Sequence, residues 1–159
     1  MLNKLSITYG SKKVLDNIEK KNANRKFALV SNNSQDNSYA LIDFSNETNI
    51  FSNPNEFDVL FNRNENYNGG LFFFNYFDLS EEQITLFDDR IKKWATKNNK
   101  SIDVLNTIIL RPLNEKNTNR VVLNICAKSA NESSFELMEF KKIINQYKNI
   151  NYFKTNYSK

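Results

Sequence analysis

The sequence lacks histidine altogether: none occurs among its 159 residues. Histidine is the only side chain whose ordinary pKa lies near neutrality, and it is the commonest metal ligand in proteins. Its absence excludes Ser-His and Cys-His catalytic pairs, zinc sites with histidine ligands and a histidine ligand to haem iron. Any chemistry must therefore rest on carboxylates, amides, phenols, a thiol or a cofactor.

Cysteine, glycine and long apolar runs are also scarce. Cys126 is the only cysteine, so no intramolecular disulfide can form, which fits a reducing compartment. Three glycines are too few for a glycine-rich phosphate-binding loop. No segment approaches ~18 uninterrupted apolar residues, and the N-terminus has no signal-peptide-like apolar run. We therefore expect a cytoplasmic protein without a transmembrane segment.

The composition that is present indicates a folded core. Hydrophobic residues make up 40% of the chain and aromatic residues 13%, which is typical of a globular protein. The formal net charge is +4. This is weaker than the concentrated positive charge of most nucleic-acid-binding proteins, so no DNA binding is expected.

The first part of the chain has a pattern of strand, helix, strand, strand, helix. Alternating apolar residues predict strands over residues 4–9, 26–31 and 38–44. Apolar spacing predicts a helix over 11–20 between the first two. Asn53-Pro54-Asn55-Glu56 is typical of a helix start, so we predict a short helix with Phe57, Leu60 and Phe61 facing inward. Residues 63–70 are polar and end in two glycines, as expected of a linker.

The second part repeats this order. Residues 71–79 are almost continuously apolar, which predicts a strand covered on both faces. Ser80-Glu81-Glu82-Gln83 forms a capping box ahead of an amphipathic helix that carries Phe87 and Trp94. Two more strands are predicted over 104–113 and 120–128, and a last helix begins near Ser133. The tail 149–159 would form an edge strand or fray.

Two such units predict a fold class. A strand-helix-strand-strand unit with a further helix belongs to the ferredoxin-like α+β type, whose sheets commonly pack face to face. We predict an α+β fold of the dimeric α+β barrel type with two strand-helix-strand-strand-helix lobes. Residues 1–66 would form an N-terminal half lobe and residues 67–159 a C-terminal lobe. The pairing would be intramolecular or would occur in a homodimer.

The aromatic strand 71–77 and the helix after it also resemble the opening of an RNA-recognition motif, in which strand aromatics stack on bases. The other half of that motif needs aromatics and a glycine on a later strand, and residues 120–126 have neither. The phenylalanines are better explained as core residues, and RNA binding is kept as an alternative.

Several segments in order carry a further resemblance: KLSITYG at 4–10, NYFDLSEEQ at 75–83, TIILRPL at 107–113, VVLNICAK at 121–128 and ESSFELMEF at 132–140. Together they resemble the two-lobed proteins of the antibiotic-biosynthesis-monooxygenase (ABM) superfamily. That group includes the haem-degrading monooxygenase of bacilli and the staphylococcal target of RNAIII-activating protein. The resemblance implies a cleft between the helices and the sheet of the C-terminal lobe.

In the haem-degrading members this cleft holds haem through an asparagine on the lobe's first strand, a tryptophan on a later strand and a histidine on the last helix. The resemblance places the asparagine position on Tyr76, with Asn75 adjacent. A one-residue shift in a strand reverses the face on which a side chain lies. The tryptophan position falls on Cys126 and the histidine position near Tyr147 or Lys148. Because the set is largely missing, haem degradation by the usual mechanism is not expected.

The same positions offer two substitute ligands. Tyr147 could bind ferric haem as a phenolate and Cys126 as a thiolate, although each is more often a core residue at such spacing. Arg111 would point into the mouth of the cleft or, preferably, form an ion pair. The candidate cofactor-binding residues are Asn75, Tyr76, Arg111, Cys126 and Tyr147, and no catalytic or metal-binding residue is assigned.

The sequence therefore supports three functional hypotheses. The first is an ABM-type monooxygenase-like protein, an oxidoreductase if it is an enzyme, which binds haem or another flat hydrophobic ligand in its C-terminal lobe. The second is a non-catalytic stress or regulatory protein that acts through protein contacts. The third is an RNA-binding module that uses the strand 71–77.

Overall fold

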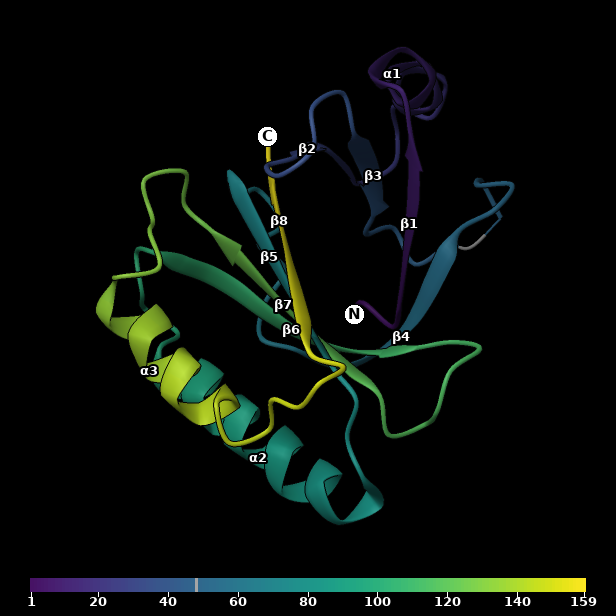
Figure 1. Ribbon diagram of the computed structural model, residues 1–159. Coiled ribbons are helices and arrows are strands. Elements are labelled where there is room, and N and C mark those ends of the chain that lie inside the picture. The colour runs from purple at the N-terminus through teal and green to yellow at the C-terminus, as the bar shows by residue number, and fades with distance from the viewer. Residues whose placement is uncertain (48) are drawn as a thin grey trace.

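Antiparallel strands close into a barrel, with helices packed on its outside (Figure 1). The computed structural model describes residues 1–47 and 49–159. In chain order its elements are β1 (Lys4–Gly10), α1 (Lys12–Lys21), β2 (Phe27–Asn32), β3 (Tyr39–Asp43), β4 (Asn55–Asn62), β5 (Leu71–Phe77), α2 (Glu81–Lys97), β6 (Val104–Pro112), β7 (Arg120–Cys126), α3 (Phe135–Ile144) and β8 (Phe153–Ser158). Around the barrel the strands follow the order β1-β3-β2-β8-β5-β7-β6-β4. The predicted α+β barrel is confirmed, closed within one chain, while a homodimer stays a prediction.

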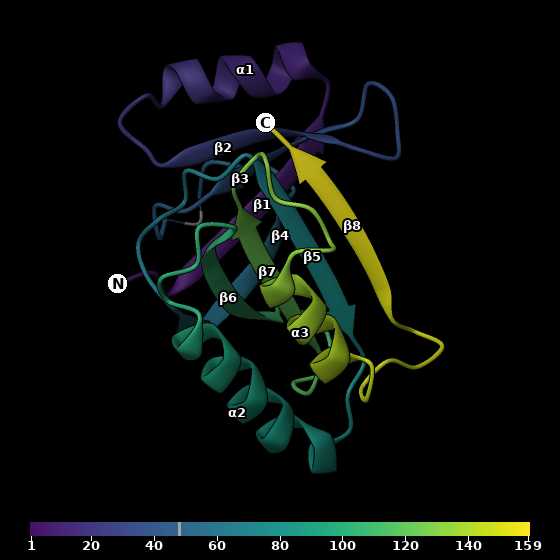
Figure 2. The ribbon, with the colours of Figure 1, turned by 90° about the vertical axis from the view of Figure 1, so that its left-hand side faces the viewer.

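The half of the barrel from β5 to β8 has the strand order β8-β5-β7-β6, which is that of a ferredoxin-like βαββαβ unit. The helices α2 and α3 lie side by side across its outer face (Figure 2). The predicted capping box at the start of α2 is present, and the backbone N–H of Ser80 donates to the side-chain Oε1 of Gln83 at 3.0 Å. Strand β5 is covered on both faces, as predicted: Phe72 faces the barrel interior and Phe73 faces the helices.

The other half, β1 to β4, carries one helix within the described residues. The helix predicted from Asn53 onward is wrong, because Asn55–Asn62 is the strand β4, which pairs with β1 and with β6. Phe57 and Val59 pack into the barrel interior, while Leu60 and Phe61 both pack outside it. The register with β6 shifts between Val59 and Phe61, at the point where the alternation changes. Pairing with two distant strands therefore overrides a local helix-start signal.

The core is divided between the barrel interior and the layer beneath α2 and α3. Phe72, Phe74 and Phe87 are completely or almost completely buried. Each such side chain stabilises the fold by about 1.5–3 kcal/mol relative to an exposed one. A smaller cluster around Leu15 and Leu41 attaches α1 to β3. None of the described helices is both long and apolar enough to cross a bilayer.

The tail is the strand that closes the barrel. β8 pairs with β5 from Leu71–Ser158 to Tyr76–Phe153, but with β2 only at Ser31–Ser158 and Asn32–Tyr157. It is therefore an inserted strand rather than an edge strand or a frayed end.

The predicted linker, residues 63–70, has no strand or helix but is tightly held. Arg63 donates hydrogen bonds to the carbonyls of Asn98 (3.0 Å) and Val104 (2.8 Å), and Tyr67 is buried. Gly69 lies so close to β7 that a Cβ atom there would be 2.7 Å from the carbonyl oxygen of Cys126. The placement of a domain boundary near residue 66 remains a prediction.

Candidate functional site

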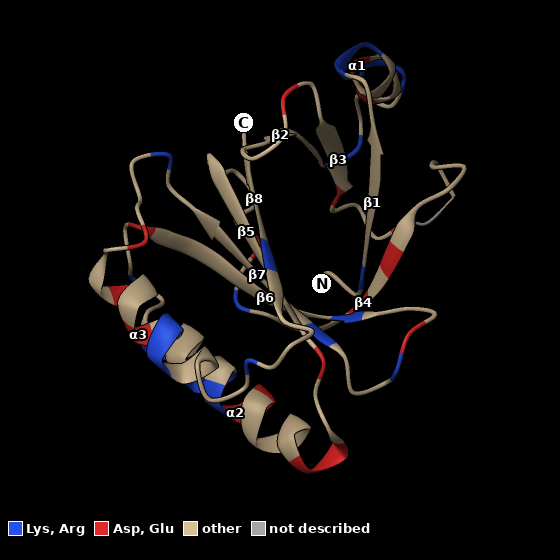
Figure 3. Cartoon of the chain, in the orientation of Figure 1, with Lys and Arg blue, Asp and Glu red and all other residues tan. Residues whose placement is uncertain are grey.

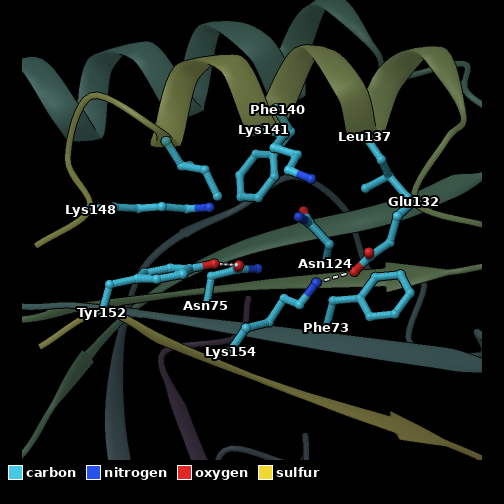
Figure 4. Close-up of a pocket in the computed structure, with 11 residues that line it drawn as sticks. Phe73, Asn75, Asn124, Glu132, Leu137, Phe140, Lys141, Lys148, Tyr152 and Lys154 are labelled. Atoms are coloured by element: carbon cyan, nitrogen blue, oxygen red, sulfur yellow. Dashed lines mark hydrogen bonds and ion pairs between the residues drawn. The ribbon is translucent and has the colours of Figure 1, made fainter. Parts of the chain in front are cut away.

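A narrow cleft, here called the α3 cleft, lies between α3 and the outer face of β5 and β7, with the segment after α3 at its edge (Figure 4). Its volume is about 60 Å³. A cavity of this size has room for roughly four to six water molecules. The cleft is therefore largely filled by the side chains that line it.

The positions of these side chains follow from the periods of the elements. On β5, Phe73 and Asn75 alternate with inward-facing residues and so point toward α3. On β7, Asn124 lies opposite Phe73. Leu137, Phe140 and Ile144 repeat at helical spacing on the face of α3 that meets the sheet. The cleft thus has aromatic and aliphatic walls and an amide-bearing floor.

The two floor asparagines are buried, with 3% of Asn75 and 0% of Asn124 exposed. The hydroxyl of Tyr152 donates to Oδ1 of Asn75 at 2.7 Å, and the hydroxyl of Thr107 donates to Oδ1 of Asn124 at 2.8 Å. Both amide oxygens are thereby used. The Nδ2 of Asn124 is buried and has no hydrogen-bond partner among the described residues. An unsatisfied buried donor costs about 1–3 kcal/mol, so an acceptor atom from a ligand or water would be stabilising there.

Lysines surround the opening. Lys141, Lys148 and Lys154 line the α3 cleft together with Glu132, which forms a close ion pair with Lys154. Burial, followed by the nearby charges of Lys141 and Lys154, lowers the pKa of Lys148. Its Nζ also lies 4.7 Å from the ring centre of Tyr152. Three lysines against one glutamate make the opening positive, and Figure 3 shows basic residues in the last turn of α3.

Of the five candidate residues from the sequence, Asn75 lines the α3 cleft. Its neighbour Tyr76 faces the barrel interior, because adjacent residues of a strand point to opposite faces. Arg111 lies on β6 and binds Asp58 at 2.6 Å, as the preferred ion-pair interpretation predicts.

The other two candidates are core residues. Cys126 is completely buried beneath the helices, and burial, with a smaller contribution from Asp103, raises the pKa of its thiol to about 12. Tyr147 packs edge-on against Phe87, with ring centres 5.0 Å apart, and the guanidinium of Arg90 lies 5.9 Å from the Tyr147 ring centre. Neither side chain lines the α3 cleft.

Several residues of the site were not found from the sequence, among them Asn124, Tyr152 and Lys154. Asn124 carried a usable signal, since it is a polar residue inside the otherwise apolar segment 121–127. Tyr152 and Lys154 carried none, because their positions depend on the pairing of β8 with β5.

The lining residues do not fit haem. The cavity is far smaller than a porphyrin and no histidine is present in the chain. Burial raises the pKa of the Tyr152 phenol to about 12, and its hydroxyl is already bound to Asn75, so a phenolate ligand is disfavoured. Within residues 1–47 and 49–159, no cluster of three or more histidine, cysteine, aspartate or glutamate side chains could hold a metal ion.

No protein-family model matches the sequence, and no curated protein matches it either. Solved structures do match. One described as a major regulator of staphylococcal pathogenesis is 14% identical, with a TM-score of 0.75 and 98% of both chains covered. A ferredoxin-fold protein related to antibiotic biosynthesis monooxygenases, from Listeria monocytogenes, is 16% identical, with a TM-score of 0.75, covering 99% of this chain and 95% of the other.

A haem-degrading enzyme from Listeria monocytogenes is similar at 17% identity and a TM-score of 0.73, with 98% of both chains covered. Identities this low establish the fold rather than the activity. The resemblance read from the sequence is confirmed at that level: the chain has the ferredoxin-like α+β barrel fold of the ABM-type monooxygenase-like proteins.

Proposed function

We propose that this protein is a monooxygenase-like ligand-binding protein whose α3 cleft takes a small flat anion, of about one ring, and does not take haem. The observation that carries the proposal is the buried Nδ2 of Asn124, a hydrogen-bond donor without a partner among the described residues. A ligand oxygen at that point would satisfy it.

The charge of the ligand follows from the lysines. Lys148 and Lys141 face the opening without a carboxylate partner within salt-bridge distance among the described residues, whereas Lys154 is bound to Glu132. Burial first, and repulsion by Lys141 and Lys154 second, lower the pKa of Lys148, and an anionic group at the opening would offset both effects. The neighbouring amides can hold a carboxylate or enolate oxygen through their N–H groups.

The shape of the ligand follows from the walls. Phe73 of β5 lies on one side of a narrow gap, and Leu137 and Phe140 of α3 lie on the other (Figure 4). Such a gap favours a planar group. The cleft is smaller than the cavity of about 150 Å³ that holds a benzene ring. Entry of one ring therefore requires the cleft to widen and the Lys148 side chain to move away from Tyr152.

The test uses benzoate, with the isosteric neutral amide benzamide as the matched probe, in NMR titrations of the intact protein. We expect saturable binding of benzoate and much weaker binding of benzamide. Lys148→Met should weaken benzoate binding about tenfold, the effect of a lost charge-assisted hydrogen bond. Lys142→Met, an exposed lysine of α3 outside the cleft, is the control and should change nothing.

Asn124→Leu tests the amide directly, since it keeps the branching and number of side-chain heavy atoms and removes the donor. It should abolish benzoate binding, with folding checked by circular dichroism. A hemin titration provides the exclusion test, and no saturable shift of the Soret band is expected. Absence of benzoate binding at millimolar concentration, or a hemin complex lost in Lys148→Met, would contradict the proposal.

A second candidate is the non-catalytic regulatory protein, which the small volume of the cleft also favours. The outer face of α3 exposes Phe135 (73%) and Met138 (48%), as a contact surface would. A protein of this kind would bind neither benzoate nor hemin. RNA binding through β5 finds no support, because Phe72, Phe73, Phe74 and Phe77 are all buried.

A further inference from the structure

One end of the barrel is open. Strands β2 and β8 pair only at Ser31–Ser158 and Asn32–Tyr157, so the rest of β8 is not paired with β2. The resulting cavity, here called the barrel mouth, lies among the ends of β1, β4, β5, β6 and β8 and the turn between β6 and β7. Its volume is about 640 Å³. This lies within the usual range of small-molecule sites, which commonly occur in the mouths of β-barrels.

Hydroxyl groups gather at this end. Strand alternation places Tyr9, Tyr76 and Tyr157 on the inward faces of β1, β5 and β8. Thr155, two residues before Tyr157, lies on the same face of β8. The barrel interior directly below them is apolar and includes Phe72, Phe74 and Leu123. The interior therefore changes from a packed core to a hydroxyl-lined mouth along the same strands.

The phenols of Tyr76 and Tyr157 are neutral at physiological pH. Burial, followed by the nearby Tyr9, raises the pKa of Tyr76 and raises that of Tyr157 to about 12. Of the charged groups at the rim, Lys116 is paired with Asp78 and Arg120 with Asp88 at 3.0 Å, while Glu115 has no cationic partner among the described residues. The mouth thus offers hydrogen-bonding groups and, in its described lining, no unpaired positive charge that would attract an anion.

The mouth also offers a stacking surface. Phe153 lies parallel to Tyr76 with ring centres 4.2 Å apart, and 53% of Phe153 is exposed. A flat ring placed against this pair would extend the stack and keep its edge near the hydroxyls.

We infer that the barrel mouth is a second binding site, distinct from the α3 cleft, for a neutral flat aromatic molecule that carries hydroxyl or carbonyl groups. The two sites lie on opposite faces of β5 and β8, so residues alternate between them: Asn75 and Tyr152 belong to the cleft, Tyr76 and Phe153 to the mouth. The inference does not depend on the proposed function of the cleft.

The test uses 2,7-dihydroxynaphthalene, which is neutral at pH 7, and naphthalene-2-sulfonate as a flat anionic counterpart. In wild-type protein with isotope-labelled tyrosine rings, we expect the neutral probe to shift the signals of Tyr9, Tyr76 and Tyr157. The signals of Tyr39 and Tyr152 should stay unchanged. The sulfonate should cause no comparable shifts.

Tyr76→Phe and Tyr157→Phe should each weaken binding of the neutral probe about two- to tenfold, the effect of one lost hydrogen bond. Tyr152→Phe, in the α3 cleft, is the matched control and should leave binding unchanged. The titration of labelled wild-type protein tests the inference even if one of these variants does not fold. The inference is overturned if the probe shifts Tyr152 instead, if the sulfonate binds as well, or if no saturable shift occurs.

Discussion

Asn75 and Tyr76 are adjacent in β5, yet Asn75 lines the α3 cleft while Tyr76 lines the barrel mouth on the other side of the sheet. The same alternation on β8 separates Thr155 in the mouth from Lys154 in the cleft. A one-residue difference in alignment therefore decides to which of the two cavities a candidate residue belongs.

The half-buried Tyr152 and the buried Tyr147 differ in what their hydroxyls do. Tyr152→Phe removes the donor to Asn75 and should lower the free energy of unfolding by about 0.5–1.5 kcal/mol. Tyr147→Phe removes a buried hydroxyl that has no partner in the described part of the chain, so it should be neutral or slightly stabilising. Urea unfolding of both variants checks the contrast, and equal losses would show that the assigned hydrogen bond contributes nothing.

Asp88 and Asp89 are neighbours on α2 with different environments. Asp88 binds the buried guanidinium of Arg120 at 3.0 Å, whereas Asp89 forms an exposed pair with Lys93. Asp88→Asn leaves Arg120 without its carboxylate and should destabilise the fold by roughly 3 kcal/mol. Asp89→Asn should cost about 0.5 kcal/mol or less. Thermal unfolding measures both, and a small effect at Asp88 would argue against a buried pair.

Gly69 is required for close packing against β7. In Gly69→Ala the new Cβ would lie 2.4 Å from Cγ2 of Ile125 and 2.7 Å from the carbonyl oxygen of Cys126. The loss of stability should be about 1–3 kcal/mol, as for other overpacked sites. Gly10→Ala is the control, because its Cβ would meet Leu15 at an ordinary 3.6 Å. Similar unfolding midpoints for the two variants would refute the close approach.

Asp58 should make stability depend on acid pH. Its hydrogen bonds with Lys4 and then with Arg111 hold the pKa of the carboxyl below its ordinary value of about 3.9. The stabilisation is therefore fully present above about pH 4 and is lost as the pH falls through the lowered pKa. Asp58→Asn should flatten the acid limb of a plot of unfolding free energy against pH. An unchanged acid limb in this variant would contradict the assignment.

The sequence was sufficient where local signals and tertiary structure agree. The capping box at Ser80 and the apolar spacing of Phe87 and Trp94 define α2 without long-range information. At Asn53–Pro54 the local signal indicated a helix, but Phe57 and its neighbours belong to a strand that must join β1 to β6. Hydrogen bonding between strands distant in sequence decided that element.

Contacts between residues distant in sequence also limit what could be predicted of the site. Asn75 was named through the family resemblance, as the neighbour of Tyr76, the position that the resemblance indicates. Tyr152 reaches Asn75 across 77 residues of sequence, and no local pattern indicates that contact. The sequence predicted that Arg111 forms an ion pair but not with which residue. Its partner Asp58 lies on β4, which was predicted to be a helix.

The insertion of β8 between β2 and β5 has a consequence during synthesis. A nascent chain cannot close its barrel until residue 158 has left the ribosome, because β8 pairs with both β2 and β5 and so joins the two halves of the barrel. Until then β2 and β5 each present an unpaired edge, and the edge of β5 carries the run of phenylalanines at 72–74. Unpaired hydrophobic edges are prone to pair with other chains, so release of the last strand should mark the end of an aggregation-sensitive stage.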